Sequence, residues 1–217
     1  MDVTRRAFLG CCGGAVMMTL PIPRWRLFEP HFRCVVLDLE EHCSLRESVS
    51  GYQAALVNPD MPHCEALIVP AALTIPPTAS RVMADALQHG ATVILESGAG
   101  FAAAGGPQLR ALRDVLRDAL RLRIEAPVDL WTADDRTRRV PYVDFTWPTA
   151  AKVRDFSRAV PLGQQEGKII ARVNGLPVAI VRRMGRGTLV FLGSPLGPAL
   201  WAGDVEARRW LHHVLSR

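Results

Sequence analysis

The residues best suited to chemistry lie in the segment Glu96-Ser97-Gly98-Ala99-Gly100, directly after the apolar residues 91–95. The apolar run is typical of a buried strand, and the glycines after it indicate a tight turn. A carboxylate at the carboxyl end of a central parallel strand stands where such sheets bind ligands, so Glu96 is a candidate general base or acceptor for a sugar hydroxyl. The alternative is that Glu96 forms a salt bridge or accepts hydrogen bonds from loop amides.

Ser97 is a candidate nucleophile, but it would need a base, and no histidine is obviously placed to serve as one. The alternative is that Ser97 caps the turn, which is a common role of serine. A second loop, residues 193–198, follows a later strand and contains Ser194. Glu96 and Ser97 are therefore the candidate catalytic residues, and the candidate ligand-binding residues are Glu96, Ser97, Gly98, Gly100 and Ser194.

Aromatic rings and a carboxylate occur together in residues 142–148, which include Tyr142, Asp144 and Trp147. Such rings can stack on sugars or anchor a partner protein, or they can pack this segment over the sheet. Asp144 is a further candidate to act with Glu96. Asp204 stands where the N-cap of a last helix is expected.

Two His-Cys pairs, His42-Cys43 and His63-Cys64, have residue types that bind metals. The first pair follows a predicted strand and the second precedes one, so we expect the pairs at opposite ends of the sheet, roughly 20 Å apart for a six-residue strand. The sequence therefore predicts no metal site and no cofactor. Cys34, Cys43 and Cys64 follow the N-terminal segment, and an odd number of cysteines without a CxxC motif does not indicate a disulfide framework. One disulfide is possible in an oxidising compartment.

The elements that would position these residues alternate through the first half of the chain. Apolar runs at 32–39, 66–70 and 91–95 predict strands, and helical periodicity follows each of them. The second half differs: residues 127–148 read as irregular, and Asn174-Gly175 indicates a hairpin between strands at 169–173 and 178–181. A strand at 188–192 and a helix after Asp204 complete one domain, residues 26–217.

The N-terminus, residues 1–25, resembles a twin-arginine export signal. Thr4 is followed by Arg5 and Arg6, and then by Phe8 and Leu9 at the offset such signals use. A short apolar run ends at Pro21 and Pro23, and it is shorter than the roughly 20 residues of a membrane span. We therefore expect the twin-arginine translocase as a partner and a periplasmic or other extracytoplasmic location. An uncleaved segment would tether the chain to the membrane.

The composition is that of an ordinary globular protein, with 49% hydrophobic and 22% charged residues. The net charge is +5, but the basic stretch at 136–139 lacks interleaved aromatic residues and reads as a solvated loop. Nucleic acid is therefore not an expected partner, and the expected ligand is an unknown small molecule or protein.

The order of elements resembles the class I glutamine-amidotransferase-like superfamily, and it is especially similar to trehalose-utilisation-type proteins and the accessory domain of certain β-galactosidases. The resemblance rests on the strand and loop at 66–73, the strand at 91–95 and the Gly-Arg-Gly-Thr-Leu-Val-Phe-Leu-Gly-Ser stretch at 185–194. The resemblance implies an α/β fold with a mainly parallel, flavodoxin-like sheet flanked by helices and a C-terminal antiparallel hairpin.

The resemblance also implies that glutaminase chemistry is absent. The catalytic families place a cysteine in the turn where Gly98 stands, and a histidine in the loop that here reads Gly193-Ser194-Pro195. The first hypothesis is therefore an exported, non-catalytic domain that binds a small molecule, such as a carbohydrate, or a partner protein. The alternatives are a periplasmic hydrolase-like enzyme that uses Glu96 and Ser97, and a structural subunit of a periplasmic complex.

Overall fold

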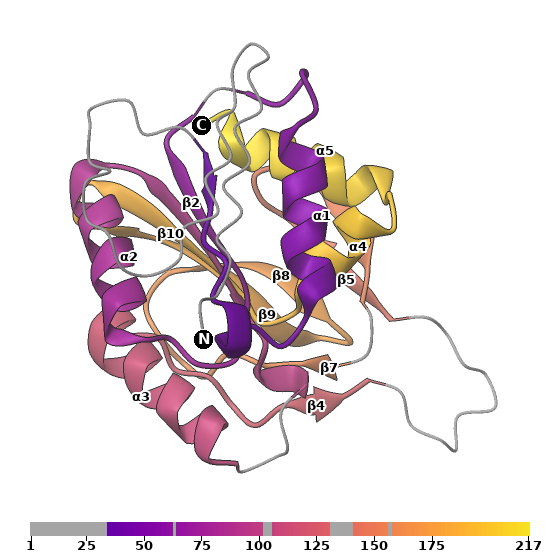
Figure 1. The fold of residues 1–217 in the computed structure, drawn as a ribbon. Coiled ribbons are helices and arrows are strands. Elements are labelled where there is room, and N and C mark those ends of the chain that lie inside the picture. The colour runs from indigo at the N-terminus through magenta and orange to yellow at the C-terminus, as the bar shows by residue number, and fades with distance from the viewer. Residues whose placement is uncertain (1–33, 63, 102–105, 131–140, 156–157) are drawn as a thin grey trace, which may run out of the picture.

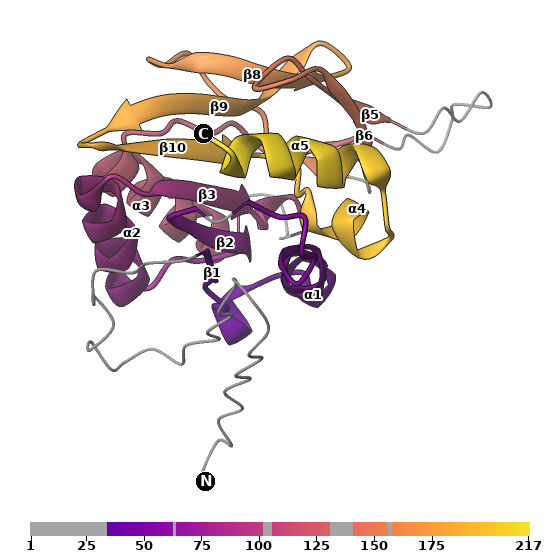
Figure 2. The same ribbon diagram turned by 90° about the horizontal axis from the view of Figure 1, so that it is seen from above.

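The fold, seen in a computed structural model, is an eight-stranded sheet with helices on both faces (Figures 1 and 2). The structure describes residues 34–62, 64–101, 106–130, 141–155 and 158–217. The strand order is β1-β2-β3-β10-β9-β8-β5-β6. A separate two-stranded ribbon pairs β4 (Val128–Asp129) with β7 (Arg158–Ala159).

The first half of the sheet is parallel. It contains β1 (Val35–Val36), β2 (Ala66–Ala72), β3 (Thr92–Ser97) and β10 (Gly187–Leu192). Nearly every residue of the middle two strands is buried, as expected of strands covered on both faces. These strands confirm the predicted β-α order, although β1 is much shorter than the predicted run at 32–39.

The second half of the sheet is antiparallel. From β10 the sheet continues through β9 (Leu176–Met184), β8 (Lys168–Val173), β5 (Tyr142–Phe145) and β6 (Ala151–Arg154). Asn174 and Gly175 both have positive φ, at 47° and 81°, which confirms the predicted hairpin turn.

The prediction of a mainly parallel, flavodoxin-like sheet is therefore wrong. Among the described residues, three of the seven strand pairings in this sheet are parallel and four are antiparallel. The error arose because residues 127–148 read as irregular, while β5 and β6 lie within or just after them. Each of these strands has only four residues and alternates buried with exposed positions, which is a weak signal beside continuous apolar runs.

Each face of the sheet is covered by its own set of helices. On one face lie α1 (Arg46–Leu56), α4 (Gly197–Trp201) and α5 (Val205–Leu215), and on the other lie α2 (Pro77–His89) and α3 (Pro107–Leu120), as Figure 2 shows. Two short 3₁₀ helices, η1 (Glu40–His42) and η2 (Ala99–Phe101), follow β1 and β3. The alternating side chains of the strands therefore build two hydrophobic cores.

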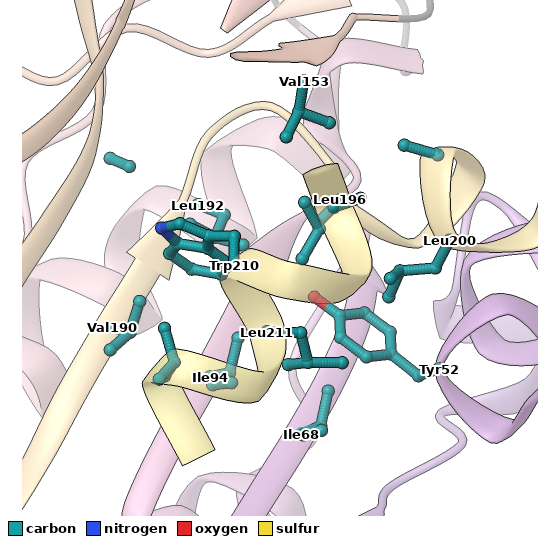
Figure 3. Packing of buried hydrophobic residues seen from close by; sticks show 14 of the residues in the cluster. Tyr52, Ile68, Ile94, Val153, Val190, Leu192, Leu196, Leu200, Trp210 and Leu211 are labelled. Atoms are coloured by element: carbon teal, nitrogen blue, oxygen red, sulfur yellow. The ribbon is translucent and has the colours of Figure 1, made fainter. Parts of the chain in front are cut away.

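The first core contains the largest buried aromatic residues. Trp210 of α5 is fully buried against Phe145, with ring centroids 4.4 Å apart. Figure 3 shows the Tyr52 ring of α1 among Leu196, Leu200 and Leu211, with its hydroxyl pointing away from α1. This hydroxyl reaches the end of β3, where the candidate site lies.

Candidate functional site

The carboxylate of Glu96, at the end of β3, is enclosed by the protein. Its exposed fraction is 0%, and it accepts hydrogen bonds from two hydroxyl groups and three backbone N–H groups. The donors are Tyr52 Oη at 2.6 Å, Ser48 Oγ at 2.9 Å, and the backbone nitrogens of Leu196, Gly197 and Ala71 at 2.6, 3.0 and 3.2 Å. One side chain thereby joins β2, β3, α1 and the start of α4.

Burial raises the pKa of the Glu96 carboxyl above its ordinary value. The hydrogen bonds from Tyr52 and Ser48, and from the backbone N–H groups of Leu196 and Gly197, oppose that rise because they favour the charged form. Burial raises the pKa of the Tyr52 hydroxyl, and the neighbouring Glu96 carboxylate raises it further. In this arrangement Glu96 organises the interior, and its oxygens do not face solvent.

Ser97 and the glycines after it form a turn that packs closely against the backbone of neighbouring segments. Ser97 is 1% exposed, and its Oγ accepts a hydrogen bond from the Ala99 N–H at 3.3 Å. A Cβ added to Gly98 would lie 2.1 Å from the Ala71 carbonyl oxygen, and one added to Gly100 would lie 2.8 Å from the Arg158 carbonyl oxygen. The glycines here permit close packing of backbone on backbone.

Ser194 lies in the loop after β10, and the structure brings this loop against the turn after β3. Its hydroxyl donates to Asp155 Oδ2, and the two residues are 5% and 1% exposed. Asp155 is a buried carboxylate that sequence reasoning missed. It follows a short edge strand, and nothing in the residues around it distinguishes it from a surface aspartate.

An ion pair lies at the carboxyl end of β1. Asp38 accepts a bidentate hydrogen bond from Arg46, with nitrogen–oxygen distances of 2.7 and 2.8 Å, and it also accepts from the Glu40 N–H. This pairing raises the pKa of the Arg46 guanidinium. Sequence reasoning missed this pair. The signal that could have found it is that Asp38 follows a strand and Arg46 begins a helix eight residues later.

The two His-Cys pairs are held in separate places. Cys43 forms an isolated bridge with Ala72 at the end of β2, and His42 Nδ1 lies 2.6 Å from Thr74 Oγ1. Cys64 precedes the start of β2, so the two cysteines lie at opposite ends of that strand as predicted. His63 lies outside the described residues. Within the described ranges, no group of three or more His, Cys, Asp or Glu residues is arranged to hold a metal.

The aromatic segment does not form one site. Tyr142 and Asp144 face outward on β5. The Lys152 ammonium lies 3.7 Å from the Asp144 carboxylate and 5.8 Å from the centre of the Tyr142 ring. Trp147 is partly buried, and its carbonyl oxygen accepts a hydrogen bond from Trp210 Nε1 at 2.7 Å.

Asp204 is the N-cap of α5, since its Oδ1 accepts from the N–H groups of Glu206 and Ala207.

A groove of about 950 Å³ opens at the other end of the parallel strands. It lies beyond the first residues of β3 and β10 and beside the last turn of α5. The groove combines cationic, aromatic, hydroxyl and carboxylate groups, which are contributed by Thr92, Trp147, Arg183, Thr188, Arg217 and Glu65, with Cys64 in its wall. The Arg217 guanidinium stacks 5.4 Å from the centre of the Trp147 ring.

The export residues Arg5, Arg6, Phe8 and Leu9 lie outside the described residues. Among the helices that the structure describes, none combines the length and apolar character needed to cross a membrane.

Comparison with known proteins gives a likeness of fold to parts of glycoside hydrolases. No protein-family model and no curated protein matches the chain. The β-galactosidase of Bacillus circulans sp. alkalophilus is 15% identical with a TM-score of 0.54, over 81% of this chain and 30% of that one. The α-L-fucosidase isoenzyme 2 of Paenibacillus thiaminolyticus is 10% identical with a TM-score of 0.52, over 85% and 32%.

A catalytic mutant of a β-galactosidase from G. stearothermophilus is 11% identical with a TM-score of 0.51, over 84% of this chain and 30% of that one. The chain thus spans about a third of the length of the enzymes that it resembles. These structures are glycoside hydrolases, and none of the three is a glutamine amidotransferase. They overturn the predicted resemblance to the class I glutamine-amidotransferase-like superfamily. That resemblance was based on element order and short turn motifs, which other α/β sheets share.

Proposed function

We propose that the chain is an exported, non-catalytic domain that binds a small carbohydrate through the groove beside α5. The observation that carries this proposal is the enclosure of Glu96. A general base must reach the proton that it abstracts, and here both carboxylate oxygens are occupied by donors from the protein itself. This favours binding over the hydrolase alternative that uses Glu96 and Ser97.

The groove offers groups that suit an acidic sugar. A guanidinium binds a carboxylate through paired N–H donors. Arg183 and Arg217 supply guanidinium groups to the groove, and the Arg217 guanidinium lies over the Trp147 ring. The glycosidase names of the structures with a similar fold make sugars the first ligand class to test.

The test is calorimetric titration of the full chain with glucuronate, galacturonate, glucose and galactose. We expect the acidic sugars to bind, and we expect Arg183→Gln to weaken that binding at least about tenfold, the loss of one charge-assisted contact. Arg172→Gln is the matched control, because Arg172 is exposed on β8 and is not among the groove residues.

The same protein is assayed for hydrolysis of aryl glycosides. We expect no turnover. Turnover that disappears in a folded Glu96→Gln variant would replace the binding proposal with the hydrolase alternative. Absence of binding by every sugar would also overturn the proposal, and it would leave the structural subunit as the remaining hypothesis.

A further inference from the structure

Two cysteines lie together at the amino end of the sheet. Cys34 immediately precedes β1 and Cys64 is two residues before β2, and these strands are parallel neighbours in which Val35 lies opposite Leu67. Both side chains belong to the same face, since Cys34 is a member of the first core and Cys64 packs against it. The two thiols are neighbours, since interaction with the other thiol is the leading influence on the pKa of each. Cys43 lies at the far end of β2.

The two thiols have different surroundings. Cys34 is buried, at 5% exposed, whereas Cys64 is half-buried and forms part of the groove wall. Interaction with Cys34 lowers the pKa of the Cys64 thiol, and the same interaction, together with burial, raises the pKa of Cys34. Cys64 is therefore the thiol that ionises first and that an incoming reagent can reach.

We propose that Cys34 and Cys64 form a disulfide that joins the starts of β1 and β2. The Cys64 thiolate attacks a low-molecular-weight disulfide, such as oxidised glutathione, to give a mixed disulfide and one released thiol. The Cys34 sulfur then attacks the Cys64 sulfur, the Cys34 proton passes to the leaving thiolate, and a second thiol is released. Both cysteines are oxidised, and the glutathione disulfide is reduced to two thiols.

The bond would secure a short strand of the sheet. Among the described residues, β1 has two residues, lies at the sheet edge and pairs with β2 alone. The loop closed by the bond contains α1, which carries the Ser48 and Tyr52 hydroxyls that bind Glu96. Closing this loop restricts the unfolded chain and favours the folded state.

The test exposes the full chain to a glutathione redox buffer, blocks the remaining thiols by alkylation, and maps the peptides by mass spectrometry. We expect a linked peptide that contains Cys34 and Cys64, which disappears on reduction. We also expect the oxidised protein to unfold at a midpoint temperature several degrees above that of the reduced protein, as is typical for a disulfide in a domain of this size.

Cys64→Ser and Cys43→Ser form a matched pair of partly exposed cysteines. The first should abolish both the linked peptide and the redox-dependent shift, and the second should preserve both. A Cys34 that is alkylated to the same extent before and after oxidation would overturn the proposal. A linkage of Cys34 or Cys64 to any other cysteine of the chain would overturn it as well.

Discussion

At the scale of single residues, the neighbours of a side chain decide what it can do. Glu96 stands at the end of a central strand, where a carboxylate can serve as a base. Five hydrogen-bond donors from three segments, however, already bind its two oxygens. Ser194 and Asp155 likewise satisfy each other inside the molecule. Most buried polar groups in proteins are paired, because an unpaired one costs about 1–3 kcal/mol.

The substitution Glu96→Gln tests this structural role. It turns one acceptor oxygen into a donor that faces other donors, so we expect a loss of about 3 kcal/mol in the free energy of unfolding, measured by urea denaturation. Glu47→Gln is the matched control, because Glu47 is exposed on α1, and it should change stability little. Equal stability of the two variants would contradict the role of Glu96.

The raised pKa of Glu96 sets the direction in which the stability loss of the Glu96→Gln variant changes with pH. Burial raises the pKa of folded Glu96 above its ordinary value of 4.5. In the pH window between 4.5 and the raised pKa, the native state therefore binds more protons than the unfolded state. The contribution of Glu96 to stability is therefore greatest below 4.5 and declines as the pH rises through the raised pKa. Glutamine does not titrate, so the stability difference between wild type and Glu96→Gln should shrink over that window.

At the scale of elements, the turn after β3 shows how backbone contacts set the residue type. The Gly98 N–H donates to the Ala72 carbonyl at 2.7 Å, and the Ala71 carbonyl and the Ser44 hydroxyl occupy the space where a Cβ would stand. Gly193 and Gly197 make similar approaches to the Val160 carbonyl and to Ser48. The loops after β3 and β10 can meet around Glu96 only because these positions have no side chain.

We therefore expect Gly98→Ala to destabilise the protein by about 2–3 kcal/mol, in the range of an overpacked interior. Gly163→Ala is the matched control, since its Cβ would meet the movable end of the Glu125 side chain at 2.7 Å and no backbone atom closer than 3.7 Å. Chemical denaturation of both variants measures the difference. A Gly98→Ala protein as stable as the control would show that the turn can open.

At the scale of the whole molecule, the described fold is a mixed eight-stranded sheet with a core on each face, accompanied by a two-stranded ribbon. Its two ends differ in character. The carboxyl end of the parallel strands is filled by Glu96, its donors and the glycine turns, and the amino end carries the groove and the pair Cys34 and Cys64. The proposed export would carry this molecule to a compartment in which a disulfide persists.

Export is tested with the double substitution Arg5→Lys and Arg6→Lys in the full chain. We expect these changes to retain the protein in the cytoplasm, because the signal that the N-terminus resembles depends on the arginine pair and not on charge alone. The control is Arg24→Lys with Arg26→Lys, which alters the same number of arginines after the apolar run. Cell fractionation measures the result, and equal export of both variants would refute the twin-arginine assignment.

The sequence by itself determined the elements whose signals are local. The apolar runs marked β2, β3 and β10, Asn174-Gly175 marked a hairpin, and Asp204 marked the start of α5. It also identified the loops after β3 and β10. Such features depend on the chemistry of a few consecutive residues, so they can be read without knowing what lies against them.

Only the tertiary structure decided the direction of the later strands and the role of Glu96. The weakly patterned β5 acquires its place by pairing antiparallel with β8, and β6 by pairing antiparallel with β5, and these strands extend the antiparallel half of the sheet. Glu96 meets Tyr52 and Leu196, which are 44 and 100 residues away in the sequence. A carboxylate has the same sequence signature whether it faces a ligand or the interior, because its exposure is fixed by segments that are distant along the chain.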